Sequence, residues 1–227
     1  DIIDSEAFSV VRLSKIYRQA ESSHIVLNAH KINAGELITL NNKNKDFFFF
    51  EKQDVRSVMG ALIYLVKTKL PEYIGTSPFE IQVLTPMRKG ELGVEHLNEV
   101  LQYYLNPASE SKKEKEGRTG VFREGDKVMQ VKNNYKLEWK ITNAKGFSVE
   151  EGLGVFNGDM GVIKQINTYS ERITVVFDEN REVEYPYSNL DELELAYAIT
   201  IHKSQGSEYP AVVLPLLSGP PILCNRN

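Results

Sequence analysis

The sequence predicts an α/β protein whose parallel sheet is interrupted by a small β-barrel. Two apolar runs near the end, 195–199 and 211–217, do not alternate with polar residues, which is typical of strands covered on both faces. Before residue 105, strand-like runs alternate with amphipathic helical patterns, as in a parallel sheet with crossover helices. Residues 126–185 instead hold several short strands separated by turns, which predicts the barrel.

The composition is that of an ordinary globular protein. The chain has 227 residues, 41% of them hydrophobic and 26% charged, enough for one large domain or one domain with an insertion. Its one cysteine, Cys224, excludes an internal disulfide and fits a reducing cytoplasm. No apolar run reaches membrane-spanning length and no signal-peptide pattern is present, so we expect a cytoplasmic protein. The chain begins at Asp1 without methionine, which indicates a fragment.

The net charge of −4 argues against a generally basic nucleic-acid-binding surface. A local basic strip along one strand is still compatible with this value. The charge is uneven, because Lys and Arg outnumber Asp and Glu by nine to five over residues 112–140, whereas residues 178–194 hold seven acids and one arginine.

Before residue 71, the patterns predict a short strand over 9–13 and two helices. The first helix is capped by Ser22 or Ser23 and stops at Gly35. The second begins at Asp54 and places its apolar residues at i, i+3, i+4 and i+7. We expect it to end at Pro71, since proline lacks the N–H that continues a helix.

A buried strand over 79–84 and an amphipathic helix over 94–104 follow. Residues 106–120 carry a mixed-charge run, which predicts a solvated and disordered segment. Beyond it we expect short strands at 126–131, 162–166, 173–177 and 183–185, and a turn at Asn157-Gly158. Tyr135 and Trp139 lie in the basic part, where either nucleic-acid contact or burial against the barrel would suit them.

A polar stretch, residues 200–208 (TIHKSQGSE), separates the two last apolar runs. Polar groups at the carboxyl end of a buried strand are where open α/β sheets bind ligands. Gly206 allows the backbone to approach a ligand closely, and exposed N–H groups there suit phosphate. An ordinary polar loop with a turn glycine is the alternative.

The stretch LELAYAITIHKSQGSEY resembles motif V of superfamily 1B DNA helicases, in the form found in RecD-like 5′–3′ helicases of the exodeoxyribonuclease V alpha-subunit type. The phrases GDKVMQVKNNY and GVFNGDMGVI resemble the SH3-like insertion of the same helicases. The resemblance implies a RecA-like fold, with a parallel sheet, helices on both faces and an SH3-like β-barrel insertion. It divides the chain into the first part of the second RecA-like domain (1–120), the insertion (121–192) and the return segment with motif V (193–227).

The resemblance also implies roles for individual residues at an ATP site. Arg18 matches the arginine of motif IV, a catalytic residue that reaches the γ-phosphate, and Gln19 lies beside it. A guanidinium suits this role because it stays charged and grips phosphate oxygens bidentately. Gly206, Ser207 and Glu208 would supply the rest of this domain's nucleotide contacts.

DNA-binding roles follow from the resemblance at two further places. Thr85 and Arg88 match motif IVa, which contacts the backbone of single-stranded DNA. The alternative is a capped loop between strand and helix whose charges are only solvated. Thr200, His202 and Lys203 belong to motif V. Lys203 could meet a DNA phosphate, pair with an acid or point to solvent.

Two motifs that phosphoryl transfer requires are missing from the sequence. It has neither a G-x-x-x-x-G-K-[S/T] phosphate loop nor an Asp-Glu pair after a buried strand, and Arg226 does not match motif VI. We therefore expect no metal site and no ATPase activity in this chain alone. The intact protein is expected to be an ATP-dependent 5′–3′ DNA helicase that uses ATP and Mg²⁺.

The expected partners are single-stranded DNA, the missing N-terminal RecA-like domain of the same protein and subunits of a recombination complex, with no membrane. The alternative is a non-catalytic module that binds single-stranded DNA or a protein in a recombination or repair complex. An upstream domain with the phosphate loop would favour the helicase.

Overall fold

The computed structural model describes residues 3–5, 7–11, 23–38, 40, 42–43, 45–118, 120–143 and 145–217. The chain falls into two units, residues 1–51 with 224–227 and residues 52–223, and each is described by itself. No helix in the described ranges is both long enough and apolar enough to cross a bilayer.

The first unit contains helix α1 (His24–Ala34). Its start at Ser23 and its stop at Gly35, which has a left-handed φ of 77°, confirm the predicted helix. Asp46 caps it from outside, because its carboxylate accepts hydrogen bonds from the Ser23 Oγ at 2.6 Å and the His24 backbone N at 3.0 Å. The strand expected over 9–13 is wrong for residues 9–11, which are irregular; residues 12 and 13 lie outside the described ranges.

Three consecutive helical segments open the second unit: α2 (Val55–Tyr64), the π-helical η1 (Leu65–Lys69) and α3 (Leu70–Ile74). The Asp54 side chain caps α2 by accepting from the Ser57 N–H, as predicted. The predicted stop at Pro71 was wrong. The wider π-helical turn comes directly before the proline, where an α-helix would clash with the ring, so the chain stays helical until Gly75.

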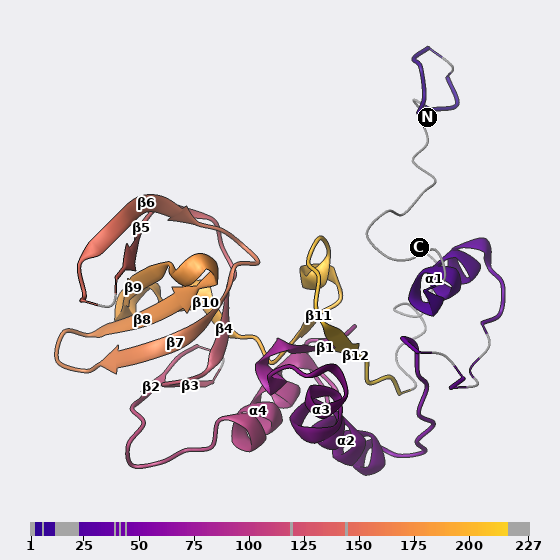
Figure 1. The fold of residues 1–227 in the computed structure, drawn as a ribbon, viewed down its shortest axis with the longest axis horizontal. Helices are drawn as coiled ribbons and strands as arrows, with labels where there is room; N and C mark the ends of the chain where they lie inside the picture. The colour runs from indigo at the N-terminus through magenta and orange to yellow at the C-terminus, as the bar shows by residue number, and fades with distance from the viewer. Residues whose placement is uncertain are drawn as a thin grey trace. The chain divides into compact units, whose positions relative to one another are not determined.

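A parallel sheet with the order β11–β1–β12 confirms the predicted α/β core (Figure 1). Its strands are β1 (Ile81–Thr85), β11 (Ala198–Thr200) and β12 (Ala211–Val213). Helix α4 (Val94–Leu105) follows β1, close to the predicted range. Buried side chains of α2, η1 and α4 join those of β1 in one apolar core: Leu62, Val66, Ile81, Val83, Leu97 and Leu101.

The second sheet is antiparallel and has the order β10–β4–β7–β8–β9–β5–β6. Its strands are β4 (Lys127–Gln130), β5 (Asn134–Thr142), β6 (Ser148–Val155), β7 (Met160–Asn167), β8 (Arg172–Phe177), β9 (Glu182–Pro186) and β10 (Leu193–Leu195). Figure 1 shows β5 and β6 arching over the other strands. Within the described ranges no ladder joins β6 to β10, so the expected barrel is an open, curved sheet.

The segment expected to be disordered forms a hairpin instead. Strands β2 (Glu114–Glu116) and β3 (Val121–Arg123) pair antiparallel. Phe122 is buried, and Arg123 Nε donates to Glu114 Oε1 at 2.6 Å. One buried aromatic side chain and one ion pair hold this hairpin. A run of mixed charges does not reveal such contacts, so the sequence did not predict the hairpin.

The apolar run at 195–199 is divided between the two sheets. β10 pairs with β4 in the antiparallel sheet, and β11 pairs with β1 in the parallel sheet. Only Ala196 and Tyr197 lie between them, and both are buried. Because both halves of the run are covered by protein, hydrophobicity alone cannot show that it crosses from one sheet to the other.

A buried polar network, which we call the junction network, joins the two sheets at this crossing. Lys127 Nζ of β4 donates to the Phe79 carbonyl at 2.7 Å and to Gln82 Oε1 of β1 at 2.9 Å. The Gln82 amide in turn donates to the Ala196 and Tyr197 carbonyls, both at 3.2 Å. Burial lowers the pKa of Lys127 to about 8.

Asp126 is the acidic part of the junction network. Its Oδ2 accepts from Gln102 Nε2 and from the Arg123 backbone N–H, each at 2.6 Å. Its Oδ1 accepts from Asn106 Nδ2 at 2.7 Å and from the Tyr197 hydroxyl at 2.9 Å. Burial raises the pKa of Asp126 although these four hydrogen bonds oppose the shift. Four donors therefore converge on this one buried carboxylate.

Candidate nucleic-acid interface

The carboxyl ends of β1 and β11 lie at one edge of the parallel sheet, where Thr85 and Thr200 are register partners. Thr85 is fully buried, and its hydroxyl donates to the Leu92 carbonyl at 2.7 Å. The Thr200 hydroxyl accepts from the Lys203 backbone N–H at 3.3 Å. Both threonines thus shape the loops that follow them, and Thr85 offers no exposed hydroxyl in this conformation.

The loop after β1 folds back onto the start of α4. The Met87 carbonyl accepts from the Val94 N–H at 3.0 Å, and the Arg88 carbonyl accepts from the Glu95 N–H at 3.1 Å. Gly93 permits this approach, since a Cβ there would lie 2.5 Å from the Lys89 carbonyl carbon. The loop is therefore fixed by backbone contacts, and it holds Arg88 beside β10.

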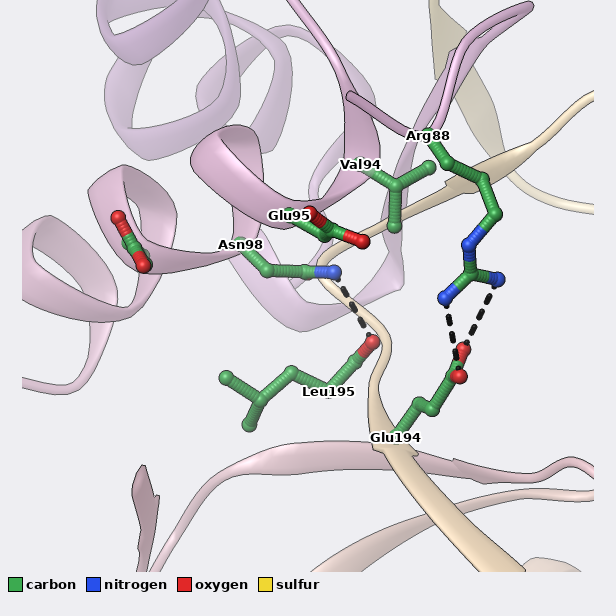
Figure 2. Close-up of a pocket in the computed structure, with 7 residues that line it drawn as sticks. Arg88, Val94, Glu95, Asn98, Glu194 and Leu195 are labelled. Carbon is green, nitrogen blue, oxygen red and sulfur yellow. Dashed lines mark hydrogen bonds and ion pairs between the residues drawn. The ribbon is translucent and has the colours of Figure 1, made fainter. Parts of the chain in front are cut away.

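Arg88 forms a two-point ion pair with Glu194 of β10 (Figure 2). Arg88 Nη2 donates to Glu194 Oε1 at 3.0 Å, and Nη1 donates to Oε2 at 3.4 Å. The Glu194 side chain is 10% exposed, whereas that of Arg88 is 43% exposed. The acid is thus held in the protein while its arginine faces solvent.

Two more cations converge on the same carboxylate. Lys203 Nζ lies 3.7 Å from Glu194 Oε2, and Arg118 Nη2 lies 3.7 Å from Glu194 Oε1. Burial lowers the pKa of Lys203, Glu194 opposes that shift and Arg88 adds to it. We call Glu194 with Arg88, Arg118 and Lys203 the Glu194 cluster. Its three cations come from three separate segments, and a single acid pairs with all of them.

A shallow pocket beside the cluster lies against α4 (Figure 2). Its lining residues are Arg88, Val94, Glu95, Asn98, Glu99, Glu194 and Leu195. The Asn98 amide donates to the Leu195 and Ala198 carbonyls at 3.0 Å, and its Oδ1 accepts from the Ala198 N–H at 2.8 Å. Asn98 thereby fixes the crossing between the sheets. Glu95 and Glu99 make the α4 side of the pocket acidic. Positive charge therefore lines only the opposite side, where Arg88 lies.

The motif V loop continues from β11 through the 3₁₀ turn η5 (His202–Ser204). His202 is exposed on this turn. Gly206 has a φ of 88°, a left-handed conformation that favours glycine, and the Ser207 N–H donates to the Ser204 carbonyl at 3.0 Å. Ser207 and Glu208 are exposed at the end of this loop.

The structure brings together four of the predicted DNA-binding residues, namely Thr85, Arg88, Thr200 and Lys203, and His202 lies on the adjoining turn. Arg18 and Gln19 lie outside the described residues. Glu194 was missed, although an acid inside an apolar run could have indicated it. Arg118 was also missed, and a lone arginine in a mixed-charge run gave no signal. In the described part of the chain, no group of three or more His, Cys, Asp or Glu side chains could hold a metal ion.

Comparison with known proteins gives two matching families. Residues 97–177 match the SH3 domain of ATP-dependent RecD-like DNA helicases. Residues 195–227 match the UvrD-like helicase C-terminal domain. The first match runs from α4 to the end of β8, and the second begins at the last residue of β10 and includes the motif V loop.

The chain is similar to an ATP-dependent RecD2 DNA helicase of Deinococcus radiodurans, with 32% identity over 94% of this chain and 27% of that protein. It is also 36% identical to an uncharacterised protein of Methanocaldococcus jannaschii, over 62% of this chain and 12% of that protein. The chain therefore spans about a quarter or less of the length of these relatives.

Among solved structures, the chain is similar to a Bacteroides Pif1 in complex with ADP-AlF4. The alignment covers 88% of this chain and 44% of the Pif1 chain, with a TM-score of 0.37 and 18% identity. The family assignment rests instead on the sequence matches. By the SH3 domain at 97–177, the C-terminal segment at 195–227 and the 32% identity over nearly its whole length, this chain belongs to the RecD-like DNA helicases.

Proposed function

We propose that this chain supplies the single-stranded DNA-binding edge of the second motor domain, and half of the ATP site, in an intact ATP-dependent 5′–3′ DNA helicase. The single observation that carries the DNA-binding part is the Glu194 cluster. Three cations meet one acid at the carboxyl edge of a parallel sheet, which is where such sheets bind ligands. The membership in the RecD-like helicases supports the motor function.

Arg88 is the residue best placed to contact a DNA phosphate. Its guanidinium uses one N–H of each terminal nitrogen on Glu194, which leaves three of its five N–H donors for another acceptor. The carboxylate holds the planar group in one orientation, and the loop backbone is fixed to α4. A phosphate would therefore meet a pre-oriented donor, which lowers the entropic cost of binding.

Lys203 supports the same contact from the motif V side. Its partial burial favours the neutral amine, and Glu194 helps to keep it charged. His202, on the exposed turn, would reach the strand next to it, while Thr85 and Thr200 would act by holding the loops. Together these residues would form a short strip along one strand, in keeping with the net negative charge of the chain.

The nucleotide half of the proposal rests on the motif V loop. Gly206, Ser207 and Glu208 are exposed, and the left-handed Gly206 leaves open space where a side chain would stand. Exposed backbone N–H groups next to a glycine suit phosphate, and this supports a nucleotide contact by the loop. For Arg18 and Gln19, which lie outside the described residues, the proposed nucleotide contacts rest on the resemblance alone. Bound ATP would supply the phosphoryl group for hydrolysis. Magnesium ligands would come from the N-terminal RecA-like domain of the intact protein.

The test is the affinity of the chain for a fluorescein-labelled oligo-dT strand, measured by anisotropy across a salt series. We expect the wild type to bind more weakly as salt rises. Arg88→Gln should reduce the affinity about tenfold at low salt and lower the slope of log affinity against log salt by about 0.7, the value of one single-strand phosphate contact. Arg172→Gln is the matched control, because Arg172 is an exposed arginine of β8 paired with Glu184.

Absence of binding by the wild type at low salt, or an equal affinity in Arg88→Gln and Arg172→Gln, would overturn the proposed DNA-binding edge. The motor part is tested separately with the full-length protein. We expect 5′–3′ unwinding that depends on ATP and is lost in Arg18→Ala. Unwinding with the opposite polarity would contradict this part of the proposal.

A further inference from the structure

Arg118 lies in the turn between β2 and β3, far in sequence from the loop after β1 and from the motif V loop. Its side chain is 67% exposed, the most exposed of the three cations of the Glu194 cluster. The turn was expected to be a solvated part of the chain. Its arginine nevertheless lies at the carboxyl edge of the parallel sheet.

The hairpin that carries Arg118 is well anchored. Phe122 is buried beneath it, and a Cβ on Gly117 would lie 2.6 Å from the Phe122 ring. The Gly117 N–H donates to the Gly120 carbonyl at 2.8 Å, which closes the turn. Arg123 adds a hydrogen bond from Nη1 to the Asn106 carbonyl at 2.6 Å. The strands on either side of Arg118 are therefore anchored to the core.

Glu194 does not account for the whole binding capacity of Arg118. Arg88 already takes both carboxylate oxygens, and the 3.7 Å separation between Arg118 and Glu194 exceeds hydrogen-bond distance. The described residues accept no hydrogen bond from the Arg118 guanidinium. An exposed ion pair of this kind contributes at most about 1 kcal/mol, so Arg118 can turn to another anion at little cost.

The other charges near Arg118 also leave room for an added anion. Asp191 lies close enough for Arg118 to help lower its pKa, but its nearest partner is Lys132. Glu95 and Glu99 belong to the α4 side of the pocket. Within the Glu194 cluster the three cations are more exposed than the one acid they share, so positive charge predominates toward solvent.

We propose that Arg118 is a third ligand for the phosphate backbone of single-stranded DNA, and that with Arg88 and Lys203 it forms one strip around Glu194 in which each cation contacts its own phosphate. This inference rests on the proposed DNA-binding function and adds a residue of the β2–β3 hairpin to it. Glu194 gathers the three cations and offsets only part of their charge, and the phosphates of the strand would offset the rest. The hairpin thereby joins the two loops of the parallel sheet in holding the strand.

The test uses the oligo-dT anisotropy assay with Arg118→Gln, Arg118→Lys and the control Arg172→Gln. We expect Arg118→Gln to weaken binding about three- to tenfold at low salt and to lower the salt slope by about 0.7. Arg118→Lys keeps the charge and should retain the wild-type slope. Thermal melting of each variant verifies the fold, which should be unaffected because the side chain is exposed.

The possible results separate this inference from the function on which it rests. If Arg88→Gln weakens binding while Arg118→Gln matches Arg172→Gln in affinity and slope, the Arg118 site is wrong and the DNA-binding edge stands. If Arg118→Lys loses as much slope as Arg118→Gln, charge is not what Arg118 contributes, and the phosphate contact is also refuted. If the wild type does not bind, both proposals fall.

Discussion

The junction network and the Glu194 cluster are both polar, and both connect the two sheets, yet they differ in how their charges are satisfied. Lys127 and Asp126 are almost fully buried, and each has protein partners within hydrogen-bond distance on several sides. The side chains of Arg88 and Arg118 are 43% and 67% exposed, and with Lys203 they share one acid.

This difference distinguishes a structural site from a binding site. A buried polar group with all its partners in the protein has no capacity left for a ligand, and losing one partner is costly. An exposed excess of cations loses little when one pair is broken and retains donors for a phosphate. We therefore expect substitutions in the junction network to affect stability, and substitutions in the Glu194 cluster to affect DNA binding.

The largest effect is expected for Asp126→Asn. Four donors point at the two carboxylate oxygens, so an amide at either position would set its own N–H groups against them. We expect the free energy of unfolding to fall by about 3 kcal/mol or more, measured by urea denaturation. Asp191→Asn is the control, because that acid is exposed and paired only at the surface. Equal, small losses of unfolding free energy in both variants would show that the junction network does not stabilise the fold more than a surface ion pair does.

Lys127 should give the stability a characteristic dependence on pH. Its pKa is about 8 in the folded protein and 10.5 in the unfolded chain, so between these values the unfolded chain binds more protons. The free energy of unfolding should therefore rise with pH across this window, by an amount on the order of 3 kcal/mol. Lys127→Met lacks the titrating group. The free energy of unfolding of the wild type minus that of the variant should therefore become more positive as the pH rises. Parallel curves from pH 7 to pH 10.5 would show that burial does not control Lys127.

Glu194→Gln should show the smallest change in stability and should act on binding in the opposite direction from the arginine variants. The amide keeps the shape of the side chain but removes the negative charge among three cations. We expect a loss of about 1 kcal/mol or less in stability. Arg88 loses the partner that orients it, but removing the negative charge beside the phosphates outweighs this loss, so we expect a severalfold gain in oligo-dT affinity at low salt. Glu184→Gln makes the same change in net charge on an exposed acid of β9. An equal gain in both variants would indicate a general charge effect.

The sequence was sufficient for the elements that have a strong periodic pattern. The apolar spacing of α4 and the uninterrupted runs around β1 and β12 predicted the parallel sheet and its order along the chain. The left-handed Gly206 after β11 also agrees with the expected loop at a strand end. These features depend on local preferences and on burial, both of which are visible in one sequence.

Features that depend on tertiary pairing could not be predicted in this way. β5 and β6 alternate weakly, because much of their surface is exposed, and they were missed. The division of the run at 195–199 depends on which strands lie beside it, and the helix past Pro71 depends on a π-helical turn. Glu194 and Arg118 are distant in sequence from the residues they meet, so only the folded chain shows the cluster.

The most direct test of the account removes all three cations of the Glu194 cluster together, in the variant Arg88→Gln, Arg118→Gln, Lys203→Gln. If these residues bind one stretch of DNA backbone, the slope of log affinity against log salt should fall by about 2, since each single-strand phosphate contact contributes about 0.7. Urea denaturation should show that the variant remains folded, because the junction network is intact. An unchanged salt slope in the folded variant would contradict the account and place the DNA-binding surface elsewhere on the chain.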